Sequence, residues 1–191
     1  MKRIGILGGT FNPVHIGHLT IAQMVHEQLK LDKVIFVPSN LPPHKSSKKV
    51  VSVKDRCHML RLAIKGNAHF DISDFEVKKR GKSFSIDTVS YLRDRYPRGT
   101  KLFFIIGSDL LPTLYTWKRI EEILKMATFV AVNRPGYKGK KSKIRVKSMT
   151  TVGLHTSSSY VRQRIISGKT VQYLVPDNIL KYIKQKKLYR K

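Results

Sequence analysis

Two histidines near the N-terminus have the spacing and the surroundings that phosphate binding requires. His15 and His18 end a glycine-rich stretch, residues 8–18, that reads GGTFNPVHIGH. Side chains three residues apart share one face of a helix, so both imidazoles can point toward the same ligand. Glycines let the backbone approach that ligand, and free amides at a helix start favour an anion. The pair therefore suits a triphosphate, and helix-capping or core histidines are the structural alternative.

A second group of residues with phosphate-binding chemistry lies near the C-terminus, in the sequence TSSSYVR at residues 156–162. Ser157 and Ser158 stand where a helix is expected to begin, and serine hydroxyls cap free amides there. Together with the helix dipole they form an anion site, and Arg162 can bind phosphate through two nitrogens. An ordinary serine-rich helix cap is the alternative, but two anion-type helix starts in one small basic chain favour a ligand.

Two common phosphate-binding motifs are absent from the chain. No Gly-x-x-x-x-Gly-Lys-Ser/Thr sequence occurs, which argues against a P-loop. The glycines at Gly5, Gly8 and Gly9 do not match Gly-x-Gly-x-x-Gly, the fingerprint of a dinucleotide cofactor site. We therefore expect a phosphate site of a different kind at residues 8–18.

The elements that must position these residues alternate between strands and helices. Strands are expected at residues 2–7, 34–37, 70–72, 101–106 and 128–132. Helices are expected at residues 17–29, 53–65, 85–95, 119–126, 157–167 and 176–185. This alternation predicts an α/β fold whose mainly parallel sheet has helices on both faces. Ligands bind such sheets at the carboxyl ends of the strands, here the loops after Leu7, Val37, Ile106 and Val132.

The composition is that of a basic globular protein. The chain has 191 residues, and 38 Lys and Arg against 12 Asp and Glu give a net charge of +26. That length fits a single domain over residues 1–191, with a helical C-terminal portion from about residue 157. A lone cysteine, Cys57, argues against a disulfide framework or a cysteine-rich zinc site.

The same composition indicates where the protein works and what it meets. No apolar run approaches the ~18 residues of a membrane helix, and the N-terminal apolar stretch is too short for a signal peptide. A cytoplasmic protein with no membrane partner is therefore expected. The positive charge attracts polyanions of any kind, including nucleic acid, anionic lipid and phosphorylated metabolites.

The two phosphate-type segments resemble the signatures of the nucleotidylyltransferases. Residues 9–18 match the form Gly-x-Phe-x-Pro-x-His-x-Gly-His, and residues 156–162 are similar to Ile-Ser-Ser-Ser/Thr-x-Ile-Arg. Thr156 and Val161 depart mildly at apolar positions, and Tyr160 stands where many members carry a polar or acidic residue. The resemblance implies a Rossmann-like three-layer α/β/α fold. It also implies transfer of a nucleotidyl group from a nucleoside triphosphate to a phosphate-bearing acceptor.

Further segments narrow the resemblance to the bacterial nicotinate mononucleotide adenylyltransferases along essentially the whole chain. They read PPHK at 42–45, SFSIDT at 83–88, IIGSD at 105–109, NRPGY at 133–137 and YLVP at 173–176. The implied reaction joins ATP and nicotinate mononucleotide into deamido-NAD and pyrophosphate, a step of NAD biosynthesis. It would proceed by direct in-line attack without a covalent intermediate. Mg²⁺ would arrive with ATP, because the motifs offer no carboxylate cluster to hold it.

The resemblance also assigns roles to individual residues. His15 and His18 would be catalytic, stabilising the transition state and the departing pyrophosphate. The residues implied for ATP are Gly9, Thr10, Phe11, Gly107, Asp109, Ser157, Ser158 and Arg162. The residues implied for the mononucleotide are Lys45, Ser85, Trp117 and Arg134.

The mononucleotide residues would divide the acceptor between them. Lys45 and Arg134 would bind its anionic groups, Trp117 would stack on the pyridine ring, and Ser85 would hydrogen-bond near the carboxylate. Simple packing is the alternative for Trp117, a helix cap for Asp109 and a solvated loop lysine for Lys45.

Three other functions stay open at this point. Pantetheine-phosphate adenylyltransferases usually have threonine where His15 stands, and their chains are shorter. Nicotinamide mononucleotide differs from nicotinate mononucleotide by one charge, and the residues themselves do not decide between them. A nucleic-acid-binding protein would carry basic residues interleaved with exposed aromatics, and no such stripe or specific motif occurs. The sequence leaves a homo-oligomer open.

Overall fold

Six parallel strands form the centre of the molecule. The computed structural model describes residues 1–40, 50–79, 83–133, 142–152 and 156–190. Its sheet has the strand order β3-β2-β1-β4-β5-β6, with every neighbouring pair parallel. The strands are β1 (Arg3–Gly9), β2 (Lys33–Pro38), β3 (Phe70–Ile72), β4 (Lys101–Gly107), β5 (Ala127–Asn133) and β6 (Lys147–Thr150).

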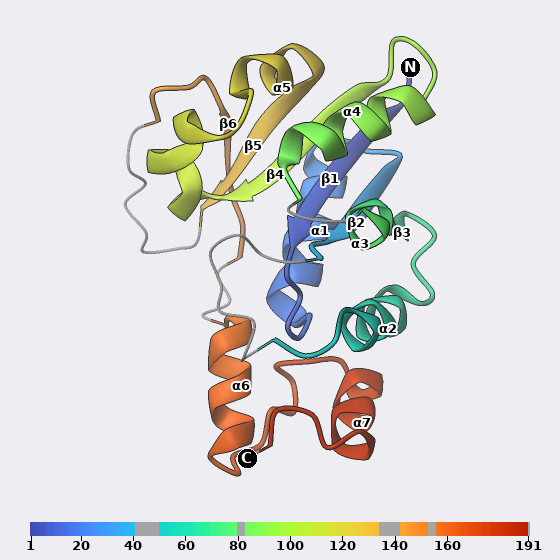
Figure 1. The fold of residues 1–191 in the computed structure, drawn as a ribbon, viewed down its shortest axis with the longest axis vertical. Helices are drawn as coiled ribbons and strands as arrows, with labels where there is room; N and C mark the ends of the chain where they lie inside the picture. The colour runs from blue at the N-terminus through green and yellow to red at the C-terminus, as the bar shows by residue number, and fades with distance from the viewer. Residues whose placement is uncertain (41–49, 80–82, 134–141, 153–155, 191) are drawn as a thin grey trace.

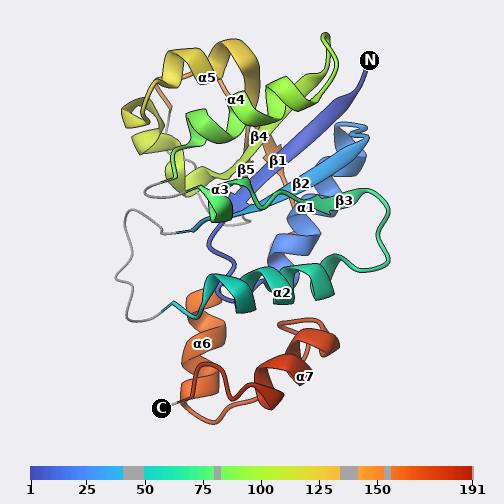
Figure 2. The same cartoon turned by 45° about the vertical axis from the view of Figure 1, so that its right-hand side comes forward.

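Helices cover both faces of this sheet, as the views in Figure 1 and Figure 2 show. In the first part of the chain, α1 (Ile16–Gln28) and α2 (Val53–Ile64) come before the edge strand β3, and α3 (Phe75–Lys78) comes after it. Those of the middle of the chain are α4 (Ser85–Arg95), the 3₁₀ helix η2 (Ser108–Thr116) and α5 (Ile120–Met126). The chain ends with α6 (Ser158–Ile166) and α7 (Asp177–Gln185).

Strand β4 shows how the sequence divides the core between the two faces. Phe103 and Ile105 pack with residues of α1 and α2, whereas Leu102, Phe104 and Ile106 pack with residues of α4 and α5. Successive side chains of a strand point to opposite faces, so a continuous apolar run is what a strand covered on both faces requires. The Rossmann-like three-layer α/β/α fold that the sequence predicts is therefore confirmed.

The strand order reverses direction beside β1. This strand pairs with β2 on one side and with β4 on the other, so the chain after β1 and the chain after β4 leave the sheet side by side. Such a switch point opens a crevice at the carboxyl ends of the strands, where ligands of this fold class bind. The histidine stretch follows β1, and Gly107 ends β4, so both lie at this crevice.

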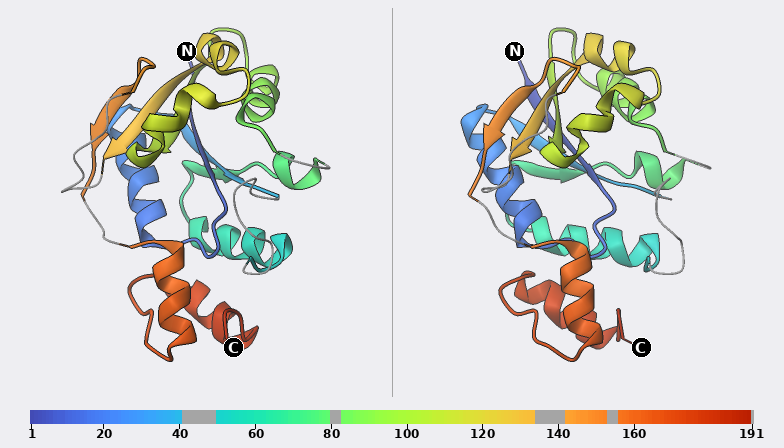
Figure 3. Two further views of the ribbon diagram at one scale, coloured as in Figure 1. Left: turned by 60° about the vertical axis from the view of Figure 1, so that its left-hand side comes forward. Right: turned by 90° about the vertical axis from the view of Figure 1, so that its left-hand side faces the viewer.

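The C-terminal helices lie beneath this edge of the sheet, at the opposite end of the molecule from the N-terminus (Figure 3). Helix α7 packs on α2, where the Asn178 side-chain amide donates to the Leu62 carbonyl at 2.7 Å. The Ile16 N–H at the start of α1 donates to the Leu174 carbonyl at 2.9 Å. Residues beyond 157 are thus attached to the first helix of the sheet domain. The expected single domain over residues 1–191 stays a prediction.

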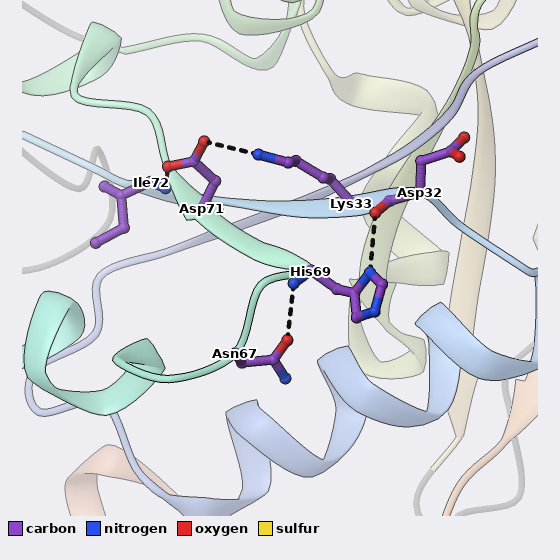
Figure 4. Close-up of polar contacts among 6 residues, drawn as sticks. All are labelled: Asp32, Lys33, Asn67, His69, Asp71 and Ile72. Atoms are coloured by element: carbon purple, nitrogen blue, oxygen red, sulfur yellow. Dashed lines mark hydrogen bonds and ion pairs between the residues drawn. The ribbon is translucent and has the colours of Figure 1, made fainter.

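The amino ends of β2 and β3 are joined by a separate set of polar contacts (Figure 4). Lys33 Nζ lies 3.7 Å from the Asp71 carboxylate, and His69 Nδ1 lies 3.3 Å from the Asp32 carbonyl oxygen. The Asn67 side chain accepts a hydrogen bond from the His69 N–H at 2.9 Å. These contacts hold the three-residue edge strand β3 in register, and they include none of the residues expected to bind substrate.

Three elements of the described residues were not expected from the sequence. Helix α3 has four residues, β6 has four, and η2 contains Pro112. Only Met149 is buried in β6, so this edge strand has no apolar alternation to reveal it. The other elements begin and end within two residues of the expected positions. Helix α5 begins at Ile120 because Arg119 adopts a left-handed conformation, with φ of 54°.

Candidate active site

The turn after β1 brings the two expected catalytic histidines together. It comprises residues 10–15 and is called the histidine turn below. His15 is the N-cap of α1, and its backbone N–H donates to His18 Nδ1 at 3.2 Å. The His18 N–H donates in turn to the His15 carbonyl at 2.9 Å. Their ring centroids lie 3.7 Å apart with the planes inclined by 34°. The two imidazoles therefore lie together at the start of the helix, as the three-residue spacing predicts.

This contact fixes the proton of neutral His18. Because Nδ1 accepts the His15 N–H, the ring proton of the neutral form sits on Nε2. His15 is buried, with 4% of its surface exposed, and His18 is half-buried. The Phe11 ring packs edge-on against the His18 ring, with centroids 5.0 Å apart. His18 is thus an imidazole oriented by the backbone at the start of α1 and by the Phe11 ring.

Gly17 allows the two sequence motifs to approach each other. A Cβ at this position would lie 3.0 Å from the Thr156 methyl group and 3.1 Å from the His15 ring. These separations are tighter than real Cβ contacts tolerate without movement, so glycine permits Thr156 to pack at the start of α1. The serine-rich segment and the histidine turn, far apart in the sequence, therefore form one site.

Hydrogen bonds from α6 hold the same turn. The Ser158 hydroxyl donates to the Pro13 carbonyl at 2.8 Å, and Arg162 Nη1 donates to the Asn12 carbonyl at 2.7 Å. Ser157 caps α6 by accepting the Tyr160 N–H at 3.1 Å. The capping role weighed as the structural alternative thus occurs at Ser157. Arg162 Nη2 also donates to the Ser159 hydroxyl at 3.1 Å, and a guanidinium has five N–H donors, so these two contacts leave others that can bind phosphate.

Gly107 and Asp109 lie at the carboxyl end of β4, beside the histidine turn. Gly107 precedes η2, and Asp109 is an exposed residue of its first turn. A Cβ on Gly107 would overlap the Asp109 carboxylate, so the absence of a side chain lets that carboxylate lie over the backbone. The two residues are placed at the crevice as expected, and their contact with the nucleotide stays a prediction.

The residues implied for the mononucleotide divide into two groups. Lys45 and Arg134 lie outside the described residues. Ser85 is the first residue of α4 and is half-buried. Trp117 is half-buried after η2, and its ring contacts Phe104 and Phe129 with centroid distances of 5.9 Å to each. Trp117 therefore packs in part on the sheet, as its structural alternative requires, and its stacking on a pyridine ring stays a prediction.

Two side chains that contact the turn were missed by the sequence analysis. Arg56 of α2 donates to the Thr10 carbonyl at 2.7 Å, and the Tyr189 hydroxyl donates to the Asn12 side-chain oxygen at 3.0 Å. Burial raises the pKa of Tyr189, so its hydroxyl keeps its proton. Arg56 had a signal in the sequence, because it stands four residues before Leu60 on the apolar face of its helix. No local pattern links residue 189 to residue 12.

One further titratable group lies near the first turn of α4. Glu76 accepts a hydrogen bond from the Thr88 hydroxyl at 2.6 Å. Burial raises the pKa of the Glu76 carboxyl, and the hydrogen bond from Thr88 only partly opposes this. The carboxylate therefore links α3 to α4 at the cost of desolvation.

Comparisons with known proteins agree with this geometry. The model of the cytidylyltransferase-like family matches residues 6–164. A probable nicotinate-nucleotide adenylyltransferase of a Thermoanaerobacter species is 40% identical, over 99% of this chain and 95% of the relative. One of Lactiplantibacillus plantarum is 43% identical, over 98% of this chain and 88% of the relative.

Solved structures show the same fold. The Plasmodium falciparum nicotinic acid mononucleotide adenylyltransferase complexed with NaAD superposes with a TM-score of 0.80 at 18% identity. The alignment covers 99% of this chain and 98% of that one. Among the helices of the described residues, none is long and apolar enough to cross a membrane. The relatives match over nearly their whole length, and the chain belongs to the nicotinate-nucleotide adenylyltransferases of the cytidylyltransferase-like family.

Proposed function

We propose that this protein transfers the adenylyl group of ATP to nicotinate mononucleotide, which yields deamido-NAD and pyrophosphate. The main support is the joining of the two motifs, in which Arg162 of α6 holds the Asn12 carbonyl beside the histidine pair. This arrangement gathers imidazole, guanidinium and hydroxyl donors at the carboxyl end of β1. The names of the bacterial relatives point to the same acceptor.

The transfer is a single in-line displacement. A phosphate oxygen of the mononucleotide forms a bond to the α-phosphorus of ATP, while the bond from that phosphorus to the bridging α–β oxygen breaks. Pyrophosphate leaves with the electron pair of the broken bond, and no protein side chain is covalently modified. Because little covalent chemistry is asked of the protein, positioning and charge stabilisation supply the rate.

The donors of the site have separate tasks in this reaction. His18 donates from Nε2 to the phosphate oxygens on which charge develops, and His15 orients His18 through its backbone N–H. The backbone of Gly9, Thr10 and Phe11 approaches the reacting phosphates. Free N–H groups of Arg162 and the serines of α6 bind the β- and γ-phosphates.

Magnesium enters the proposed reaction as part of the substrate MgATP. Among the residues that the structure describes, no three acidic, histidine or cysteine side chains cluster closely enough to hold a metal ion. Magnesium prefers to keep several waters and to bind substrate phosphates, so the ion can be carried by the triphosphate itself. Its role is to neutralise charge on the departing pyrophosphate.

The test is the release of pyrophosphate from ATP and Mg²⁺ with three separate acceptors. These are nicotinate mononucleotide, nicotinamide mononucleotide and phosphopantetheine. The proposal predicts a clear preference for the first. Preference for another acceptor would leave the phosphate site in place and overturn the assignment of the acceptor. For the in-line step, ATP with a chiral α-phosphorothioate should give a dinucleotide with inverted configuration, and retention would contradict a single displacement.

A further inference from the structure

Arg56 is a charged side chain in the interior of the molecule, with 1% of its surface exposed. Its guanidinium donates to four backbone carbonyls from three segments of the chain. The acceptors and distances are Thr10 at 2.7 Å, Ser39 at 2.8 Å, Asn40 at 3.0 Å and Val51 at 3.3 Å. A planar group with five donors in fixed directions can join several carbonyls in this way, whereas a flexible ammonium cannot.

Three of these acceptors, Thr10, Ser39 and Asn40, lie just beyond the ends of the paired strands β1 and β2. β1 and β2 are paired as far as Gly9 and Pro38, and the Ser39 N–H makes one further hydrogen bond to the Gly9 carbonyl at 2.9 Å. The Arg56 side chain joins Thr10 to Ser39 and Asn40 immediately after the last of these sheet-type hydrogen bonds.

A second contact ties the approach to α2 into the same arrangement. The Val51 N–H donates to the Asn12 side-chain oxygen at 3.3 Å, and the Val51 carbonyl accepts from Arg56 Nε. Residues 10–12 of the histidine turn are thus connected to residues 39–40 and to residue 51. The connections to residues 39–40 depend on one side chain of α2, that of Arg56, whereas residue 51 is connected both through Arg56 and through its own N–H.

The charge of Arg56 has no acidic partner in the part of the chain that the structure describes. The ion pairs found there involve other residues, and burial lowers the pKa of Arg56. A buried charge is costly unless it is well hydrogen-bonded, and charge-assisted bonds to carbonyls are among the stronger ones. Had packing alone been required here, an apolar side chain would have met it without that cost.

We propose that Arg56 is a positioning residue for adenylyl transfer, which holds the histidine turn at a fixed separation from the end of β2. This inference rests on the proposed function, because the turn matters for the rate only if phosphates react there. In-line attack needs the two substrates aligned, and a displacement of about 1 Å can lower the rate about 100-fold. Arg56 does not itself touch a reacting atom.

The test compares Arg56→Lys with a matched control, Arg93→Lys. Arg93 of α4 also donates to two backbone carbonyls, but these belong to Thr100, just before β4, and to Met126, just before β5. Both variants keep the positive charge and lose the planar set of N–H donors that the guanidinium provides. We expect Arg56→Lys to lower kcat about 10- to 100-fold, whereas Arg93→Lys keeps the kcat and both KM values of the wild type.

Urea unfolding of both variants separates positioning from stability. If Arg56→Lys is folded and has wild-type kcat, or loses no more activity than an equally destabilised Arg93→Lys, the proposal is wrong. Failure of the proposed function can be distinguished from failure of the Arg56 proposal, because in the first case the wild-type protein itself makes no deamido-NAD. The activity of Arg56→Lys is therefore always compared with that of the wild type.

A measurement on the unmodified protein decides the matter if Arg56 variants do not fold. The Nε–H signals of Arg56 and Arg93 are followed by NMR while a non-hydrolysable ATP analogue is added. Because Arg56 contacts the turn that would receive the phosphates, its signal should shift while that of Arg93 stays in place. An unmoved Arg56 signal, with the Thr10 amide signal showing that the analogue is bound, would overturn the proposal.

Discussion

The hydroxyl of Tyr189 donates a hydrogen bond to the Asn12 side-chain oxygen at 3.0 Å, between residues 177 positions apart. Asn12 belongs to the histidine turn, and Tyr189 lies near the C-terminus. The end of the chain therefore contributes directly to the conformation of the turn that precedes α1. Asn12 also accepts the Val51 N–H through the same oxygen, so its side chain joins three distant segments.

Tyr189→Phe removes this one hydroxyl and keeps the ring. We expect it to lower the free energy of unfolding by about 1 kcal/mol and to reduce kcat, because a buried acceptor loses its donor and the turn is less constrained. Tyr182→Phe is the matched control, because the Tyr182 hydroxyl donates at 2.8 Å to Asp55, outside the turn. Urea unfolding and initial rates are measured for both. Equal kinetic effects in the two variants would contradict a specific role for Tyr189.

Arg162→Ala tests the proposed anion site at the start of α6. The variant should raise the KM for ATP about tenfold or more, since hydrogen bonds to charged groups contribute about 1.5–3 kcal/mol. The KM for nicotinate mononucleotide should change much less. Arg164→Ala, on the same helix, is the control, because Arg164 donates to the Thr170 carbonyl at 2.8 Å and to Tyr160. An unchanged KM for ATP in Arg162→Ala would remove Arg162 from the nucleotide site.

Trp117→Ala separates substrate stacking from packing on the sheet. Loss of the contacts with Phe104 and Phe129 should lower stability by up to about 3 kcal/mol. If the ring also stacks on the pyridine, the KM for the mononucleotide should rise about tenfold while that for ATP is unchanged. Trp117→Phe, which keeps an aromatic face, should recover part of both losses. A lower stability of Trp117→Ala without any change in the KM for the mononucleotide would show that Trp117 serves packing alone.

The pKa of Glu76, which burial raises, predicts a pH-dependent stability. The folded state binds the proton more tightly than the unfolded state, so the Glu76 contribution is most favourable below the unfolded pKa of about 4.3. This contribution is lost as pH rises through the folded pKa. Glu76→Gln should therefore be more stable than the wild type at pH 7, with the difference vanishing near pH 4. Urea unfolding at both pH values measures this, and an equal difference at both would contradict it.

The parts of the fold that the sequence predicts are those governed by local pattern. Strand β4 is a continuous apolar run because both faces of it are covered, and glycines and histidines occur together where β1 ends and α1 begins. Strand β6 escaped prediction because it lies at the sheet edge with one buried residue, Met149. Its pairing with β5 is decided by tertiary contact rather than by its own residues.

The contacts of the site also divide into those that a local sequence pattern predicts and those that only the tertiary structure shows. The placement of His15 against His18 follows from their spacing within one helix turn. The contacts of Arg56 and Tyr189 join residues 46 and 177 positions apart, and no periodicity within a short window carries that information. A charged residue on the apolar face of α2 was the one sequence signal available. Lys45 and Arg134 lie outside the described residues, and their roles stay predictions.

In the proposed function, the histidine pair stabilises the transition state of adenylyl transfer to nicotinate mononucleotide. Its most direct test is the formation of deamido-NAD from ATP, Mg²⁺ and nicotinate mononucleotide by the wild type and by His18→Ala, with His58→Ala on the exposed surface of α2 as the control. We expect product from the wild type and from the control. In His18→Ala the turnover number should fall by a factor of about 100 or more, because the Nε2–H contact strengthens in the transition state. Binding of the mononucleotide should change little. Folded wild-type protein that makes no dinucleotide would show that the proposed reaction is wrong, and His18→Ala that turns over like the wild type would show that the proposed role of His18 is wrong.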